Sequence, residues 1–182
     1  MAPKAPVDFN APFQSARPET HEEWQARMGL EVLAVLRSEL YLDFRFLDQA
    51  LGALTPAADE RCGVMATDGR TLYYQPSALL RLYRENPKYL KRLYLHTIFH
   101  CVFRHLWLQG SRDPVLWHVA CDIAVENVID GLGRKSILRP LTYVRRRAYE
   151  ALTQGGHVAA AASAYRWLLT QTPGVQKQLA RE

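Results

Sequence analysis

Hydrophobic positions recur at a helical period over most of the chain. The segment 22–40 places five apolar residues on one side of a predicted helix: Trp24, Met28, Val32, Val35 and Leu36. Thr20 followed by Glu23 matches a capping box at the start of that helix. A second helical stretch, 44–56, is expected to stop at Pro56.

One part of the chain alternates as a β-hairpin does. Two short runs, 64–66 and 71–74, flank Asp68-Gly69, and this dipeptide supplies the positive backbone angles of a tight turn. After Pro76 the pattern becomes helical again. The sequence therefore predicts an α+β fold that is mainly helical, with one small β-hairpin.

Two later helices are apolar nearly all round. The first is expected to run from Asn86-Pro87 to Gly110, and the second from Asp113-Pro114 to Gly131 or Gly133. An apolar surface on every side is typical of central helices. A basic segment and an Ala-rich helix at about 157–169 follow.

Composition fits one globular domain over residues 19–182. The chain has 182 residues, of which 48% are hydrophobic, so it can bury a sizeable core. Residues 1–18 hold four of the ten prolines and are expected to form a poorly ordered tail. We find neither a membrane-span pattern nor a signal-peptide pattern, so a cytoplasmic protein is expected. Three cysteines without a CxxC pair indicate buried thiols.

Ionisable residues interrupt both apolar helices at four-residue spacing. Four residues turn a helix by about 400°, so His96 and His100 share one face. His105 is about 140° further round and cannot join them unless the helix breaks. In the second helix Asp122 and Glu126 repeat the spacing, and His118 extends their stripe.

Burial of carboxylates in an apolar setting is costly unless they are paired or bound to a cation. Imidazole nitrogens and carboxylate oxygens suit zinc, and open zinc sites use three protein ligands. A zinc ion held between the two helices would satisfy both. The alternative is a metal-free network in which the histidines bond Asp122 and Glu126 directly.

The order of these motifs resembles a known family. The stretches "MATDGRTLYYQP", "YLHTIFHCVFRHLW" and "LWHVACDIAVENVID" are similar to the zincin-like metallopeptidase domain of bacterial proteins that often carry a C-terminal von Willebrand factor A-like domain. The resemblance implies that His96, His100 and Asp122 bind one zinc ion. It also implies a protein or peptide partner, such as the von Willebrand factor A-like domain.

The motif departs from HExxH at one decisive position. The glutamate that acts as general base in zincins is replaced by Thr97. Loss of a positioned general base costs about 10²- to 10⁴-fold in rate, which predicts an impaired peptidase that acts in binding or assembly. Two alternatives assign a role to Glu126. It acts either as a substitute general base of an active hydrolase or as a fourth zinc ligand that closes the site.

Basic residues concentrate in the segment 134–147. A solvated helix face is the simpler interpretation, and an anion or nucleic-acid binding module is the alternative. This segment lacks the aromatic interleaving of nucleic-acid binders, so a nucleic-acid partner is not expected. Cys101 and Cys121 are expected to pack in the core. Tyr73, Tyr74 and Tyr94 either line a pocket beside the site or belong to the core.

Overall fold

The computed structural model describes residues 17–154 and 160–181, so most of the expected tail lies outside the described residues. Helix α1, His21–Asp43, begins as predicted with a capping box between Thr20 and Glu23. Its buried face, however, is turned from the predicted one. It consists of Gly29, Val32, Leu33, Leu36 and Leu40. Trp24 and Val35, predicted on that face, are each more than two-fifths exposed.

The segment predicted as a second helix, 44–56, is instead a short helix followed by a strand. It forms the 3₁₀ helix η1, Arg45–Leu47, the helix α2, Asp48–Gly52, and the first residues of the strand β1, Thr55–Ala58. β1 is one of the two edge strands of a three-stranded sheet, and an edge tolerates Pro56. The sequence pattern did not predict this strand, because four residues with one proline carry no alternation.

The predicted hairpin is present as β2, Met65–Thr67, and β3, Thr71–Tyr74. These strands pair antiparallel with Thr67 opposite Leu72, and β1 pairs parallel with the other edge of β3. Gly69 has a φ of 90°, which the turn requires. The Asp68 carboxylate accepts hydrogen bonds from the backbone N–H groups of Arg70 and Thr71, so its role is in the turn.

Helices α3, Pro76–Glu85, and α4, Pro87–Val102, follow the sheet, and the side chain of Asn86 caps α4 as expected. The prediction that α4 continues to Gly110 was wrong. It stops at Val102, and Arg104 then adopts a left-handed conformation with φ 58° before the 3₁₀ helix η2, His105–Trp107. The apolar pattern runs on without glycine or proline, so the sequence carried no stop signal.

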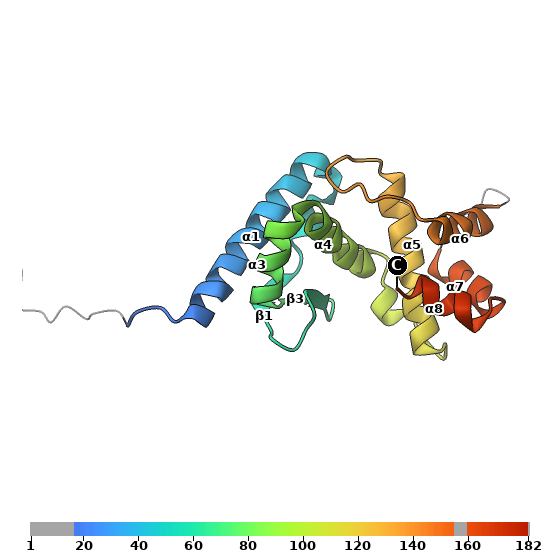
Figure 1. The fold of residues 1–182 in the computed structure, drawn as a ribbon, viewed down its shortest axis with the longest axis horizontal. Coiled ribbons are helices and arrows are strands. Elements are labelled where there is room, and N and C mark those ends of the chain that lie inside the picture. Colours follow the sequence, from blue (N-terminus) through green and yellow to red (C-terminus); the bar gives the residue numbers. More distant parts are fainter. Residues whose placement is uncertain (1–16, 155–159, 182) are drawn as a thin grey trace, which may run out of the picture.

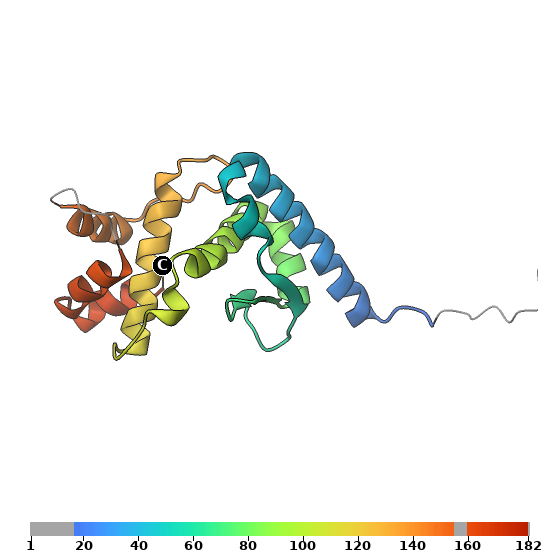
Figure 2. The same cartoon turned by 180° about the vertical axis from the view of Figure 1, so that it is seen from behind.

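The second apolar helix, α5, Pro114–Gly131, has the predicted bounds and a predicted Asp113 cap. The helices α6, Tyr143–Thr153, α7, Ala161–Leu169, and α8, Pro173–Leu179, complete the described fold. In Figures 1 and 2, α5 lies between two groups of elements: α1, α3 and α4 with the sheet on one side, and α6 to α8 on the other. The predicted Ala-rich helix corresponds to α7, and residues 157–159 of that prediction lie outside the described residues.

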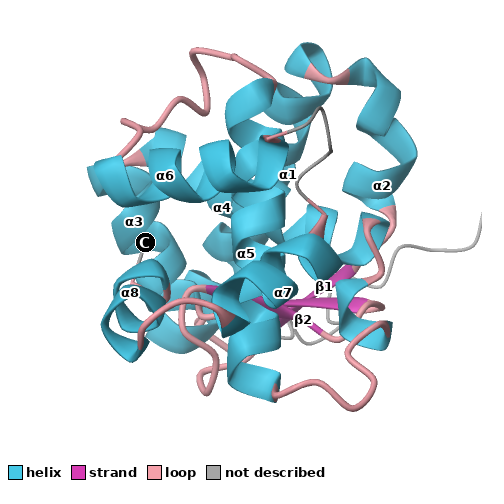
Figure 3. Ribbon diagram, turned by 90° about the vertical axis from the view of Figure 1, so that its right-hand side faces the viewer, coloured by secondary structure: helices cyan, strands magenta, loops and turns pink. Residues whose placement is uncertain are grey.

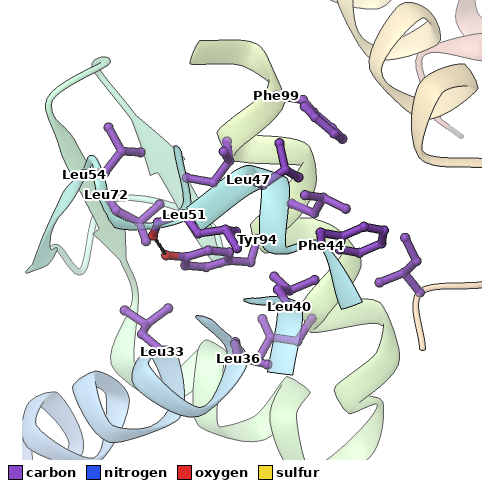
Figure 4. Close-up of a cluster of buried hydrophobic side chains, with 14 of the residues drawn as sticks. Leu33, Leu36, Leu40, Phe44, Leu47, Leu51, Leu54, Leu72, Tyr94 and Phe99 are labelled. Carbon is purple, nitrogen blue, oxygen red and sulfur yellow. Dashed lines mark hydrogen bonds between the residues drawn. The ribbon is translucent and has the colours of Figure 1, made fainter. Parts of the chain in front are cut away.

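Buried side chains form one large core cluster and two smaller ones. The large cluster joins α1, α2, α4 and the sheet, and Figure 4 shows its leucines around Tyr94, whose hydroxyl donates a 2.8 Å hydrogen bond to the carbonyl of Leu51. The smaller clusters join α5 to α6, α7 and α8. Helix α5 contributes to all three, with Val125, Ala120 and Trp117 as examples.

The fold class is α+β and mainly helical, as predicted. Figure 3 shows how small the sheet is beside the helices. Among the described residues, every helix is too short or too polar to cross a lipid bilayer.

Gly29 is expected to be essential to the packing of α1 on the sheet. A Cβ at this position would lie 2.5 Å from Cε2 of Tyr74, a ring that is 1% exposed and whose hydroxyl is bonded to the carbonyl of Ala26. We predict that Gly29→Ala lowers the free energy of unfolding by about 1–3 kcal/mol, although alanine favours helices. Urea denaturation measures this.

The matched control is Gly131→Ala at the end of α5, where a Cβ meets nothing within 4 Å. This variant should be neutral or more stable by up to about 1 kcal/mol. Equal effects of the two substitutions would contradict the close approach at Gly29.

Candidate metal centre

Two helices supply the candidate site. His96 and His100 project from α4, and Asp122 projects from α5, which packs against α4. The Nε2 atoms of the two histidines are 2.9 Å apart, and Oδ1 of Asp122 lies 3.5 Å from the first and 3.2 Å from the second. The three residues that the sequence predicted as ligands therefore present one atom each to a common point.

The triangle formed by these three atoms fits a zinc ion. Ligands at 2.0–2.1 Å in a tetrahedral arrangement lie roughly 3.3 Å from one another. The three observed separations bracket that length. Two neutral imidazoles and one carboxylate are also donors that zinc accepts in open sites. The side chain of Asp122 is half exposed, so the triangle is accessible from solvent.

Glu126 contacts the opposite side of the His96 ring. Its Oε1 is 2.9 Å from Nδ1 of His96, whereas the triangle contains Nε2. When the His96 ring is neutral, a carboxylate at Nδ1 holds the remaining proton there and leaves the lone pair of Nε2 directed at the triangle. Its other oxygen, Oε2, accepts hydrogen bonds from Arg92 and Arg145. Both oxygens are thus engaged, and this arrangement favours a positioning role for Glu126.

A buried ionic network surrounds Glu126. Arg92 and Arg145 are each 3% exposed, and both pair with Glu126 and with Asp130, one turn further along α5. The hydroxyl of Tyr149 donates a hydrogen bond of 2.9 Å to Asp130. Two buried cations and two carboxylates balance one another, which buried charges require.

Sequence reasoning missed the members of this network, although a signal was present. Arg92 precedes His96 by four residues, and Asp130 follows Glu126 by four. Each predicted stripe was therefore one residue too short. The prediction that the basic segment is a solvated helix face was wrong for Arg145, since it is buried against the two acids. Arg139 also approaches Glu126, at 4.0 Å.

The charges of the site alter the pKa values of its members. Burial alone would lower the pKa of His96, but its hydrogen bonds to Asp122 and Glu126 outweigh this effect and raise it to about 9. Burial would raise the pKa of Glu126, yet His96 and Arg92 lower it to about 2. Asp122 likewise has a lowered pKa, because its bonds to His100 and His96 outweigh burial. Both acids are carboxylates at neutral pH.

His105 lies beside the triangle, contrary to the prediction from an unbroken helix. Because α4 ends at Val102, the chain turns back and brings the His105 ring to 5.2 Å from the His100 ring, edge to face. His105 is 6% exposed, and its Nδ1 has no hydrogen-bond partner among the described residues. Burial and the neighbouring His100 lower its pKa to about 4, so the ring is neutral near pH 7.

The hydroxyl of Thr97 is turned away from the site. Thr97 occupies the position of the general base in HExxH and is 6% exposed. Its Oγ1 donates a 2.9 Å hydrogen bond to the carbonyl of Leu93, one turn back on its own helix. The hydroxyl is therefore occupied by the helix backbone.

The remaining candidates have other contacts. Cys121 is buried, and burial raises its thiol pKa to about 12, while Cys101 packs against the large core cluster. His118 is exposed at a cavity of about 150 Å³ that it shares with His100 and His105.

The three tyrosines have partners outside the triangle. Tyr74 and Tyr94 donate to backbone carbonyls in the core, and Tyr73 donates to Asp68 in the turn.

The raised pKa of His96 predicts a pH-dependent stability for the metal-free protein. The positive charge on His96 stabilises the folded state. This stabilisation is fully present below about pH 6.5, the ordinary pKa of histidine, and is lost as pH rises through about 9, the pKa in the folded protein. We expect the free energy of unfolding to fall over this window by on the order of 2 kcal/mol, less than the whole shift allows because Asp122 is half exposed.

Urea denaturation at several pH values in the presence of a chelator measures this fall. His96→Gln should remove it, and His118→Gln, which changes an exposed histidine of the α5 stripe, should keep it. A fall of equal size in the His96 variant would assign the dependence to another group.

One of three comparisons with known proteins identifies a family. A family model described as "Putative metallopeptidase domain" matches residues 35–158, which include α4, α5 and all three triangle residues. Searches of curated proteins and of solved structures returned no match. The match covers more than half of the chain. The chain therefore belongs to the family of metallopeptidase domains that this description names.

Proposed function

We propose that this domain binds one zinc ion through His96, His100 and Asp122 and that it engages a peptide or protein partner with little or no hydrolysis. The single observation that carries the proposal is the convergence of three donor atoms from α4 and α5 on one point. The family match supports a metal-dependent, peptidase-like role for the domain.

Three protein ligands and the half-exposed Asp122 favour an open zinc site. A bound zinc ion would supply a Lewis acid that polarises a carbonyl and lowers the pKa of a water molecule. Glu126 holds the proton of His96 at Nδ1 and so directs Nε2. Because Oε1 lies at the far nitrogen of this ring and Oε2 at Arg92 and Arg145, Glu126 as placed supports an open site more than a closed four-ligand one.

We expect peptide hydrolysis to be impaired because the site lacks, among the described residues, a group for proton transfer. A zincin needs a carboxylate that takes a proton from water and passes it to the leaving amine. Thr97 cannot take that proton near neutral pH, and its hydroxyl is already bonded to the carbonyl of Leu93. Glu126 is ionised but is committed to His96, Arg92 and Arg145. We infer from these contacts that a base is missing at the triangle.

Zinc binding is tested by substituting one triangle residue and one histidine outside it. We predict that the purified domain binds one zinc ion per chain and that His100→Ala reduces its zinc affinity at least 100-fold, since one of three ligands is lost. Elemental analysis and titration with a competing chelator measure stoichiometry and affinity.

His118→Ala is the matched control, because His118 lies on the α5 stripe but outside the triangle. Its zinc affinity should equal that of the wild type. Equal zinc content in the wild type and the His100 variant, with both folded, would refute the metal centre.

Restoring the missing base tests the catalytic part. Thr97→Glu recreates HExxH, and we expect its peptide hydrolysis to exceed that of the wild type by about 10²-fold or more. Thr97→Gln has the same size but cannot act as a base, so it should stay at the wild-type rate. Thermal unfolding and zinc content of both variants establish that the comparison is between folded, loaded proteins.

Two outcomes would contradict the hypothesis that peptide hydrolysis is impaired. In the first, Thr97→Glu retains zinc and fold yet hydrolyses no faster than Thr97→Gln. In the second, the wild type hydrolyses peptides and Glu126→Gln abolishes this while zinc is retained. The second outcome would make the protein an active zinc hydrolase with Glu126 as its base.

A further inference from the structure

A second, larger cavity is lined in part by His105, whose ring packs against His100 of the triangle. It has a volume of about 560 Å³, within the range of small-molecule sites. Most of its wall is apolar and comes from the chain after α4, from α5 and from α7. The apolar residues include Phe103, Leu108, Trp117, Ala124, Val128 and Ala161. A ligand in this cavity would bury a largely apolar body.

Arg112 is the charged residue in this wall. Its guanidinium lies 4.7 Å from the centre of the Trp117 ring, and Nη1 donates hydrogen bonds to the carbonyls of Leu108 and Gln109. Stacking and these bonds fix its position. Among the described residues neither Nη2 nor Nε has a hydrogen-bond acceptor, so both can donate to a bound molecule. The described residues of the wall include no acidic one, so Arg112 favours an anionic group.

The start of α7 adds to this preference. Ala160 and Ala161 line the cavity where the nine-residue helix begins, and Ala160 offers no side-chain acceptor as its cap. The N-terminal end of a helix carries a partial positive charge.

His105 provides an independent sign of a ligand. This residue lines the cavity, is 94% buried, and its Nδ1 has no hydrogen-bond partner in the described part of the chain. A buried polar atom without a partner is costly unless a bound molecule satisfies it. His105 also lines the smaller cavity beside His100, so it lies between the large cavity and the triangle.

We propose that this cavity binds an apolar carboxylate, with the carboxylate at Arg112 and the apolar body against Phe103 and Trp117. The C-terminal residue of a peptide, with a large apolar side chain, has this chemistry. The assignment to a peptide rests on the proposed function, whereas binding of the carboxylate itself does not depend on zinc.

Binding of 3-phenylpropionate to the chelator-treated full chain tests the site by isothermal titration calorimetry. We expect the wild type to bind it and Arg112→Gln to bind it at least about tenfold more weakly, because a charge-assisted hydrogen bond is lost. The uncharged analogue 3-phenylpropan-1-ol should bind both proteins equally, which would show that the cavity is intact. Arg147→Gln, which changes an exposed arginine outside the cavity wall, is the matched control.

Three results would overturn the proposal. One is absence of 3-phenylpropionate binding to the wild type, and another is equal binding to Arg112→Gln. The third is loss of binding in His100→Ala with retention in Arg112→Gln, which would place the anion at the triangle. None of these results bears on whether the domain binds zinc. Rejection of the carboxylate site is therefore distinguishable from rejection of the metal centre.

A separate binding experiment tests whether the ligand is the C-terminal residue of a peptide. Acetyl-glycyl-phenylalanine should bind more tightly than its C-terminal amide, by about tenfold, and Arg112→Gln should remove the difference. If the free acid and the amide bind equally while 3-phenylpropionate binds as expected, the ligand is a small acid and the assignment to a peptide terminus is wrong.

Discussion

The contact between His96 and Glu126 is the interaction on which the site depends, because it joins the polar stripes of two buried helices. An apolar helix pair can bury ionisable groups only if they satisfy one another. Glu126 does so in two directions, toward the imidazole of α4 and toward the guanidinium groups of Arg92 and Arg145. One carboxylate therefore aligns a prospective metal ligand and neutralises part of the core.

This arrangement divides the polar residues between two tasks. Among the triangle residues the side chain of Asp122 is half exposed, whereas Asp130, Arg92 and Arg145 are turned into the protein. The inner group sets the position and protonation of the outer one. A similar division is common at metal sites, where the residues behind the ligands fix ring orientation and basicity.

Sequence reasoning succeeded where the signal was local and periodic. Four-residue spacing placed His96 with His100 and Asp122 with Glu126, and Asp68-Gly69 identified the hairpin, because a helix face and a tight turn each follow from a few neighbouring residues. The choice of Asp122 as the third ligand came from the family resemblance. The reasoning failed where the chain's path depended on distant contacts. Arg104 adopts a left-handed conformation without glycine, and β1 exists because it pairs with β3. Arg145 is buried because the acids of α5 meet it, which a count of basic residues does not reveal.

The early end of α4 has a consequence for how the chain can vary in length. His105 reaches His100 only because a turn of fixed size, with one left-handed residue, separates it from the helix. Each residue added to an α-helix rotates everything after it by about 100°. Insertions or deletions between positions 100 and 105 would therefore swing this imidazole out of the cavity wall, even though His105 lies outside the helix itself.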